Sequence, residues 1–541
     1  MITNRLFFRL LQSAVFLLAA FVFMSPPQAP DMNETFRSLA LGMEASSLSL
    51  AGHAIFLFLS QTISDFTQEP IEQAAFLSKA ILLFLSGLAA YALLKKAGVS
   101  TYESAGGSIL YFALGHHCCG ATPEMFLWLL FPLLVIAARY PSQMKITDFP
   151  DGEAIRPRDI LLAGDAHIGK FSIENSINES RLSMVGAFAL SVIGWNVCWQ
   201  FFLWPLSLSA ILIASMLCRT GDRFFKPGTI FRHMLVCFAG LAFSPGLLAK
   251  ALGWLSLVFD YISNDITPWG LQILAIETPD FHKLPILLLL LMLTILRMLY
   301  RPRPLTWDII SCYCLAATLL LCDHRLMFPF VFWSCLLSAN FPGIEEDRIP
   351  ALKPKSDRLG LGLVLALLFS GLLWSIFAGQ PTKQQTHSLA GDLLRKIPKY
   401  TGQHETRVIA HPNLNGESLF LGKRIFAANA PESLEANEKA LTGSLASDAW
   451  HIFNHTEKLE AVLSHWGADY LITYYQSFLS TYLIELGGWK IVAFSEDPVN
   501  IVKGQVESKQ LVLLAGKDTA LAGANSEIKN HRLLESCTAS H

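Results

Sequence analysis

The sequence predicts an α-helical protein that crosses a membrane many times and ends in an α/β domain outside the cytoplasm. Of its 541 residues, 52% are hydrophobic and 16% are charged, and the mean hydropathy is +0.42. Several apolar runs reach the roughly 20 residues needed to cross a bilayer about 30 Å thick. The basic residues between these runs fall on alternate sides, which is the asymmetry that membrane insertion produces.

The apolar runs indicate about eleven transmembrane spans. The first follows Arg5 and Arg9, and no small-x-small cleavage site comes after it, so we interpret it as a retained signal anchor. The spans are predicted near residues 6–24, 74–94, 104–119, 124–139, 183–197, 200–218, 233–253, 284–300, 306–322, 326–341 and 359–379.

The loop charges predict the side of the membrane on which each loop lies. One side holds most of the Lys and Arg residues, and basic loops are retained in the cytoplasm. The other side holds almost only Arg37, Lys283 and Arg325 before the final third of the chain. The N-terminus is therefore predicted inside, and an odd number of spans places the final third outside.

Composition divides the chain into three parts. Residues 1–379 form the polytopic domain, with a long first outer loop at 25–73 and a polar cytoplasmic insertion at 140–182. Within the first loop, the short apolar run Ala54–Leu59 predicts a helix lying on the membrane surface. Residues 380–505 are predicted as the extracytoplasmic α/β domain, and residues 506–541 as a flexible tail.

The outer domain shows alternating strand and helix signals. Arg407–Ala410 and Tyr470–Ile472 are predicted strands, and Leu479–Leu486 has helical periodicity that stops at two glycines. Lys490–Phe494 and Val499–Val502 are predicted to pair as a closing hairpin.

Charge and cysteine content argue against two classes of function. The net charge of −2 gives no sign of nucleic-acid binding. The ten cysteines contain no Cys-x-x-Cys pair, and most lie in or beside predicted spans. Packing is therefore expected of them, rather than a disulfide framework or a metal site.

Ionisable residues at the outer ends of the spans are the candidate functional groups, because charge is costly at membrane depth. They form three sets that topology places on one face, where we expect them to share a cavity. The sets are Asp31 with Glu34, Glu124 alone, and Asp323 with His324 and Arg325.

This order of parts resembles the GT-C superfamily of polytopic glycosyltransferases, in particular the bacterial branch that uses polyprenyl-phosphate sugars. The resemblance covers most of the chain through short, degenerate motifs. They are Asp31-Met-Asn-Glu34, the second span ending Leu-Leu-Lys-Lys-Ala-Gly-Val-Ser, Thr-Pro-Glu124-Met, an Arg325 hairpin with Pro329 after it, Gly-Ala-Asp-Tyr-Leu-Ile-Thr, and Gly-Gly-Trp489-Lys-Ile-Val-Ala-Phe-Ser-Glu-Asp. The chain departs from the family in lacking adjacent acids in its first loop and in carrying Glu124 where Asp is usual.

The resemblance implies roles for these residues. Asp31 would be the general base on the acceptor hydroxyl, with Glu34 beside it in the catalytic loop. Glu124 would position the acceptor, share the base role or hold a divalent cation with Asp31. Arg325 would bind the donor phosphate, with Asp323 and His324 nearby. Sugar or acceptor contacts would come from His116, His117, Trp195, Trp199 and Trp269.

Each residue also has a structural interpretation. Asp31 can be a solvated loop residue or a helix cap, and Glu124 a first-turn carboxylate favoured by the helix dipole. Arg325 can simply pair with Asp323. The histidines can pack at the interface, and the tryptophans can mark the aromatic belt at the lipid boundary.

The resemblance implies an enzyme of the bacterial inner (plasma) membrane that moves a sugar from a polyprenyl-phosphate carrier to an extracytoplasmic glycan, lipid or protein. Two alternatives stay open at this stage. One is a transporter or flippase of a lipid-linked precursor, and the other is a non-catalytic membrane scaffold that displays the C-terminal domain. The sequence does not identify the sugar, the acceptor or the carrier lipid. The one candidate cofactor is a divalent cation.

Overall fold

The fold is taken from a computed structural model of the full chain. The chain divides into two compact units, which we call the helical unit (Met1–Gln28, Ala45–Ala249 and Ile276–Gln380) and the C-terminal unit (Ala29–Glu44, Lys250–Ala275 and Pro381–His541). The structure describes residues 2–24, 32–43, 51–97, 99–139, 184–217, 227–244, 284–299, 307–322, 327–339, 354–378, 393–394, 396–398, 400–401, 404–410, 424–425, 459, 463, 468–475, 477–495, 499–502, 505–508 and 510–516.

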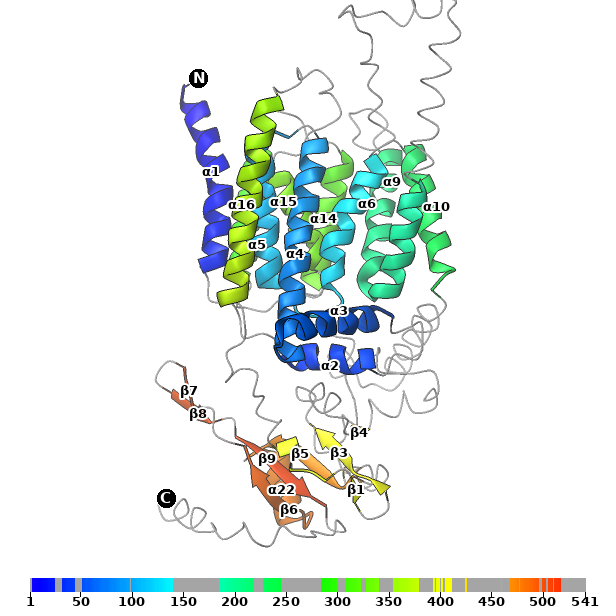
Figure 1. The fold of residues 1–541 in the computed structure, drawn as a ribbon, viewed down its shortest axis with the longest axis vertical. Coiled ribbons are helices and arrows are strands. Elements are labelled where there is room, and N and C mark those ends of the chain that lie inside the picture. Colours follow the sequence, from blue (N-terminus) through cyan, green and yellow to red (C-terminus); the bar gives the residue numbers. More distant parts are fainter. Residues whose placement is uncertain are drawn as a thin grey trace, which may run out of the picture. The chain divides into compact units, whose positions relative to one another are not determined.

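The helical unit is built from apolar helices packed side by side (Figure 1). In chain order they are α1 (Ile2–Met24), α3 (Ala51–Thr67), α4 (Ile71–Lys96), α5 (Thr101–Cys118), α6 (Met125–Arg139), the helix Met184–Val197, the 3-10 turn η3 (Trp199–Phe202), α9 (Leu203–Leu217), α10 (Pro227–Leu241), α13 (Leu284–Leu299), α14 (Trp307–Cys322), α15 (Met327–Ser338) and α16 (Pro354–Ala378). Helices α4, α5 and α6 form its centre, and α1, α15 and α16 pack around them.

A helix occupies each position at which a span is predicted. In the part of the chain that the structure describes, one of them, Ile71–Lys96, is both long and apolar enough to cross a membrane. Within the described residues, nine further helical stretches are apolar over 10–17 residues each. The count of about eleven spans therefore stays a prediction.

The boundaries of α10 differ from the predicted span at 233–253. The helix runs from Pro227 to Leu241. Proline suits the first helical position because it lacks only an N–H group that would have no partner there. The helix ends at Leu241, before Pro245 in the sequence. A proline disfavours helical geometry in the residue that precedes it, here Ser244.

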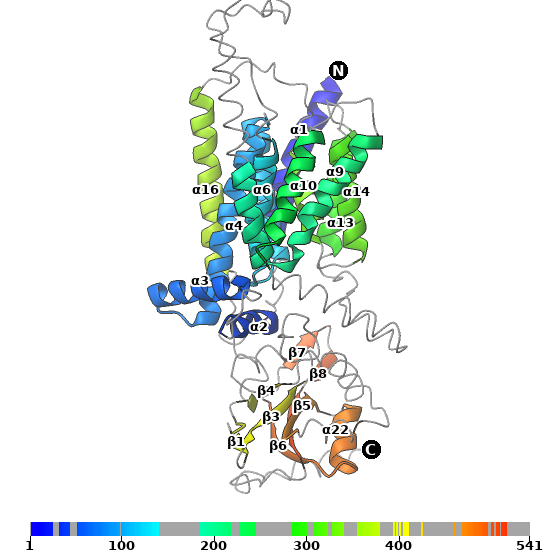
Figure 2. The same ribbon diagram turned by 90° about the vertical axis from the view of Figure 1, so that its right-hand side faces the viewer.

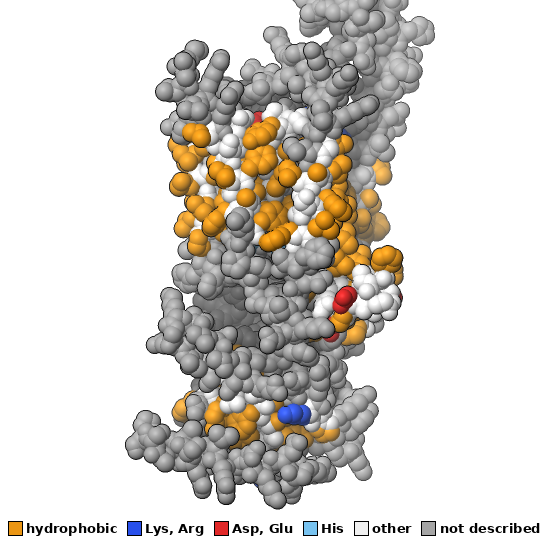
Figure 3. All heavy atoms as spheres, turned by 60° about the vertical axis from the view of Figure 1, so that its left-hand side comes forward, with side chains coloured by type: hydrophobic (Ala, Val, Ile, Leu, Met, Phe, Trp, Pro, Cys, Tyr) orange, Lys and Arg blue, Asp and Glu red, His pale blue; other side chains and the backbone are white. Residues whose placement is uncertain are grey.

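Small residues let the central helices approach closely. A Cβ atom on Gly107 would lie 2.6 Å from the Cβ of Ala339, and one on Gly115 would lie 2.7 Å from a methyl of Leu83. Such contacts are typical of helices packed within a membrane. The outward surface of the unit is covered by apolar side chains, which form the orange band in Figure 3.

The C-terminal unit contains α2 (Met32–Met43) and a mixed sheet of five strands in the order β4-β3-β5-β9-β6. The strands are β3 (Arg407–Ala410), β4 (Arg424–Ile425), β5 (Tyr470–Tyr474), β6 (Lys490–Phe494) and β9 (Leu511–Ala515). Strand β3 is parallel to β4 and β5, and β9 is antiparallel to β5 and β6. Helix α22 (Phe478–Glu485) follows β5, and two short pairs, β1 (Tyr400–Thr401) with β2 (His404–Glu405) and β7 (Val499–Val502) with β8 (Gln505–Ser508), complete the described strands.

Two predictions for this unit are wrong. Lys490–Phe494 pairs with β9 instead of with Val499–Val502, which pairs with Gln505–Ser508. The domain also does not end near residue 505, because β9 lies between β5 and β6 and all five of its residues are buried. A strand that is apolar at every position is typical of one covered on both faces.

The two faces of the sheet hold separate apolar clusters. Val512 and Leu514 pack with Leu479 and Leu483 of α22, whereas Leu511, Leu513 and Ala515 pack with Leu393, Leu394 and Ile397. Alternate residues of β9 therefore contribute to opposite clusters, as the two-residue period of a strand requires.

The Gly-Ala-Asp-Tyr motif has a structural explanation. The Oδ2 atom of Asp469 accepts a hydrogen bond of 2.9 Å from the N–H of Arg407, and its carbonyl oxygen accepts one of 2.8 Å from the N–H of Gly516. Asp469 thus ties the beginnings of β3 and β5 to the end of β9. In this motif the carboxylate organises the sheet.

Candidate functional site

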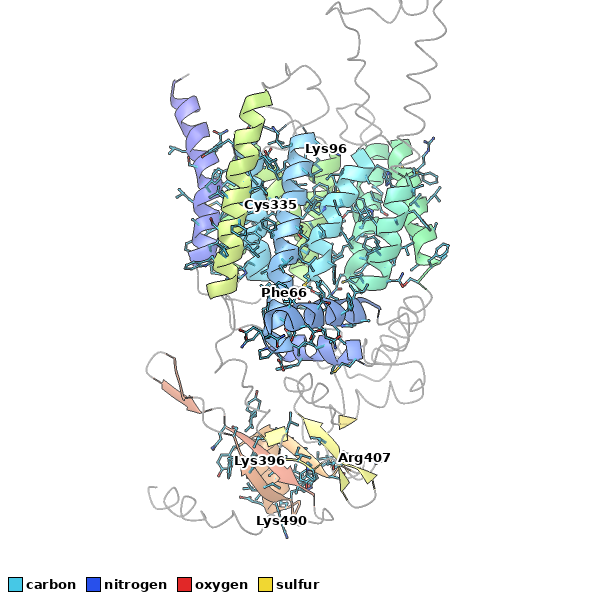
Figure 4. The ribbon with its side chains drawn as sticks, in the orientation of Figure 1. Phe66, Lys96, Cys335, Lys396, Arg407 and Lys490 are labelled. Carbon is cyan, nitrogen blue, oxygen red and sulfur yellow. The ribbon has the colours of Figure 1, made fainter. Side chains whose placement is uncertain are left out.

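The helical unit has two ends, which we name by their residues. At the Lys96 end, Lys95 Nζ donates to Thr101 Oγ1 at 3.0 Å. At the other, the Glu124 end, Lys79 Nζ donates to the carbonyl oxygen of His116 at 3.0 Å. Figure 4 shows Lys96 and Phe66 at opposite ends of the unit.

Three helix ends gather at the Glu124 end, and two of them, those of α6 and α15, lie next to predicted site residues. Helix α1 ends at Met24, and the ring of Phe23 stacks against His116 with centroids 6.3 Å apart. Helix α6 begins directly after Glu124. Helix α15 begins at Met327, and Phe328 lies against Trp128 with centroids 5.0 Å apart. These contacts bring together helix ends that are about three hundred positions apart in the chain.

Glu124 is the predicted catalytic residue whose side chain the structure describes. It is half-buried, and its Oε1 atom accepts a hydrogen bond from Nε2 of Gln200. The amide oxygen of Gln200 in turn accepts from the thiol of Cys198. The η3 turn after Cys198 places this buried amide beside the carboxylate. The arrangement holds a carboxylate in a fixed position at the end of the bundle, which suits it to positioning or proton transfer.

The histidines and one tryptophan occupy distinct environments. His116 and His117 lie in the last turn of α5 and are half-buried. The indole of Trp195 is 6% exposed, donates to the carbonyl oxygen of Cys237 at 2.9 Å and packs against Phe201. Its burial and its satisfied N–H group favour packing over sugar stacking for Trp195.

The other predicted residues are described in part or lie outside the described residues. Glu34 lies in the first turn of α2, and Trp199 opens η3, each with a described backbone only. Asp31, Asp323, His324, Arg325 and Trp269 fall outside the described residues. Convergence of the three predicted sets therefore stays a prediction.

Within the described part of the chain, no group of three or more His, Cys, Asp or Glu residues is placed to hold a metal ion. The predicted pair for a divalent cation, Asp31 with Glu124, includes a residue outside that part. A carboxylate such as Glu124 is a suitable ligand for a hard cation, but Gln200 turns its Nε2 donor toward Glu124 and its amide oxygen toward the Cys198 thiol.

The Lys96 end holds a buried ion pair that the sequence interpretation missed. Arg297 Nη2 lies 3.6 Å from Glu103 Oε1, and the two side chains are 2% and 8% exposed. Arg297 Nε donates to the carbonyl oxygen of Ser338 at 2.9 Å, and Gln12 Nε2 donates to Glu103 Oε1 at 3.0 Å. The pair thereby joins α1, α5, α13 and α15.

The sequence does contain a signal for Lys79 and Arg297, two basic residues at opposite ends of the helical unit. Lys79 and Arg297 both lie inside predicted spans, where any ionisable residue deserves a partner or a function. Gln200 offers no comparable signal, because a single amide at the end of an apolar run is common. Only the turn of η3 brings it to Glu124.

Comparison with known proteins gives a likeness in structure but none in sequence. No family model matches the chain, and no curated protein matches it either. Among solved structures, the apo form of the oligosaccharyltransferase of Archaeoglobus fulgidus is similar over 86% of this chain and 69% of that one, with a TM-score of 0.36 and 12% identity. A likeness at this level assigns no role to any residue of the chain.

Proposed function

We propose that the chain is a membrane glycosyltransferase whose site lies at the Glu124 end and faces away from the cytoplasm. It moves a sugar from a polyprenyl-phosphate carrier to an extracytoplasmic glycan, lipid or protein, with the protein in the bacterial inner membrane. The observation that carries the proposal is the gathering of three helix ends: those of α1, α6 and α15. Helix α6 begins directly after Glu124 and α15 begins two residues after Arg325, whereas Asp31 directly precedes α2 of the C-terminal unit.

The surface of the helical unit supports the membrane part of this proposal. Large apolar side chains are exposed on the outer helices, for example Leu17 at 69% and Leu299 at 72%. Exposed hydroxyl groups on the same surface form their hydrogen bonds within their own helix. Thr318 Oγ1 donates to the carbonyl oxygen of Cys314, and Ser370 Oγ donates to that of Ala366. Lipid offers no hydrogen bonds, so a helix in a bilayer has to satisfy its polar groups internally.

The direction of α16 bears on the final third of the chain. A Cβ atom on Gly371 would lie 2.6 Å from the ring of Phe112 and 3.2 Å from that of Phe23. Phe23 lies at the Glu124 end, so α16 runs toward that end and the chain leaves the helix there. In the proposal, α16 therefore ends on the extracytoplasmic side of the membrane.

The chemistry divides among the residues as follows. Asp31, which follows the end of α1, removes the proton of the acceptor hydroxyl as its oxygen attacks the anomeric carbon. Glu124, held by Gln200, positions the acceptor. Arg325, two residues before α15, binds the donor phosphate and stabilises the charge of the leaving group.

Asp31→Asn tests the proposal, because it keeps the size of the side chain and removes the base. Transfer of a radiolabelled sugar from a polyprenyl-phosphate donor, measured on membranes that contain the protein, is expected to fall by about 10²-fold or more. The matched control is Asp65→Asn, which removes an exposed carboxylate from α3. Unchanged transfer by Asp31→Asn at normal membrane levels removes Asp31 from the mechanism.

A further inference from the structure

Helix α3 carries a stripe of exposed apolar side chains. Ile55, Phe58 and Phe66 are 43%, 70% and 89% exposed. Because residues three or four positions apart share a helix face, these three lie along one edge of α3, with Thr62 between the two phenylalanines. An aromatic stripe of this kind on a protein surface usually marks an interaction site.

The stripe presents no unsatisfied polar group at its centre. Thr62 Oγ1 donates to the carbonyl oxygen of Phe58 at 2.8 Å, within the same helix. Thr318 of α14 and Ser370 of α16 do the same on the exposed surface of the bundle. The stripe on α3 thus has the chemistry of the surface that we assign to lipid.

The remaining faces of α3 complete an amphipathic arrangement. Gln61 and Asp65, four residues apart, form an exposed polar edge beside the stripe. Phe56 and Ser60 form the buried face. A helix with one packed face, one apolar edge and one polar edge fits the boundary between lipid and water.

The position of α3 is fixed by the helical unit. Figures 1 and 2 show α3 lying across the ends of the other helices instead of running beside them. Gly52 lies so close to the end of the helix Met184–Val197 that a Cβ atom on Gly52 would be 1.8 Å from the carbonyl oxygen of Val197. In the space-filling view, apolar atoms continue from the band on the bundle to the level of α3 (Figure 3).

We propose that α3 lies in the membrane interface at the Glu124 end, with Ile55, Phe58 and Phe66 inserted among lipid acyl chains and Asp65 facing water. The partner is neutral lipid, since Ala51–Thr67 contains no Lys or Arg that would attract anionic headgroups. This inference rests on the membrane placement in the proposed function and is independent of sugar transfer.

Site-specific photo-crosslinking tests the placement. The full chain is prepared with p-benzoylphenylalanine at Phe58 or at Phe66, reconstituted in nanodiscs of phosphatidylcholine and irradiated. Mass spectrometry then measures lipid adducts. Matched controls carry the same photoreactive residue at Gln61 or at Asp65. We expect at least fivefold more lipid adduct at the two phenylalanine positions than at the controls, and an unchanged ratio when a third of the lipid is phosphatidylglycerol.

Three results would overturn the inference. Equal adducts at all four positions, or none at Phe58 and Phe66, would show that the stripe does not face lipid. Adducts to another protein at those positions would identify a protein partner. Adducts that require phosphatidylglycerol would exclude an apolar mode of binding. Each variant must keep the thermal unfolding profile of the unmodified protein, and none of these readouts depends on the Asp31→Asn experiment.

Discussion

The two ends of the helical unit use charge in different ways. At the Lys96 end, Glu103 and the buried Arg297 pair with each other, and they bind Gln12 and Ser338. At the Glu124 end, Lys79, His116, His117 and Glu124 are only half-buried. The pair at the Lys96 end links four helices, whereas the half-buried groups at the Glu124 end lie at helix ends, where a ligand can reach them. In the proposal, the Lys96 end holds the bundle together and the Glu124 end carries the chemistry.

Removing Arg297 should have the largest effect on stability. Arg297→Ala leaves the Glu103 carboxylate buried without its cation, which costs about 3–5 kcal/mol. Thermal unfolding in detergent measures the loss. The double variant Glu103→Leu with Arg297→Met should recover most of it, because two apolar residues of similar volume need no partner. A single variant as stable as the parent would show that the pair does not hold the Lys96 end.

Gly52→Val should have an intermediate effect, because the new side chain would collide with the backbone of Val197. We expect a loss of about 1–3 kcal/mol as α3 moves away from the end of the helix Met184–Val197. Unfolding in detergent measures it, and lipid adducts at Phe58 report the movement.

Gly186→Ala is the control for this substitution, since a Cβ atom there meets nothing within 4 Å. It should be neutral, or stabilising by up to about 1 kcal/mol. Similar losses in both variants would mean that the close approach of α3 to Val197 is unimportant.

Glu124→Gln should have the smallest effect on stability, within about 0.5 kcal/mol, because an amide oxygen can still accept the hydrogen bond from Gln200. Sugar transfer should nevertheless fall at least tenfold as the charge disappears. Arg297→Ala should give the opposite pattern, a large loss of stability with sugar transfer by the folded protein retained. If Glu124→Gln unfolds the protein or leaves transfer intact, the contrast between the two ends fails.

The sequence was sufficient to locate the helices at the predicted spans, but not to predict how those helices pack. Apolar runs and loop charges located a helix at every predicted position, since length and hydropathy are local properties. The start of α10 was missed by six residues, because its first turn, from Pro227, precedes the apolar run used to predict it. The contact of Gln200 with Glu124 could not be predicted, as it depends on how η3 meets α6.

In the C-terminal unit, too, the local elements were predictable from the sequence, but the pairing of the strands was not. Strands β3 and β5 and helix α22 were predicted from local periodicity, and they are present. The pairing of β6 with β9 was not predicted, because adjacent strands favour a hairpin on sequence grounds alone. Burial of Leu511–Ala515 on both faces of the sheet decides the pairing, and that burial is a property of the whole unit.

Photoaffinity labelling with a polyprenyl-phosphate sugar that carries a diazirine on its sugar tests most directly which end binds the donor. Reconstituted protein is irradiated with the probe, with excess unlabelled donor as competitor, and the labelled peptides are identified by mass spectrometry. We predict competed labelling in the segments around Glu124 and Arg325. Competed labelling confined to the segments around Lys96, Glu103 and Arg297 would contradict a sugar-transfer site at the Glu124 end.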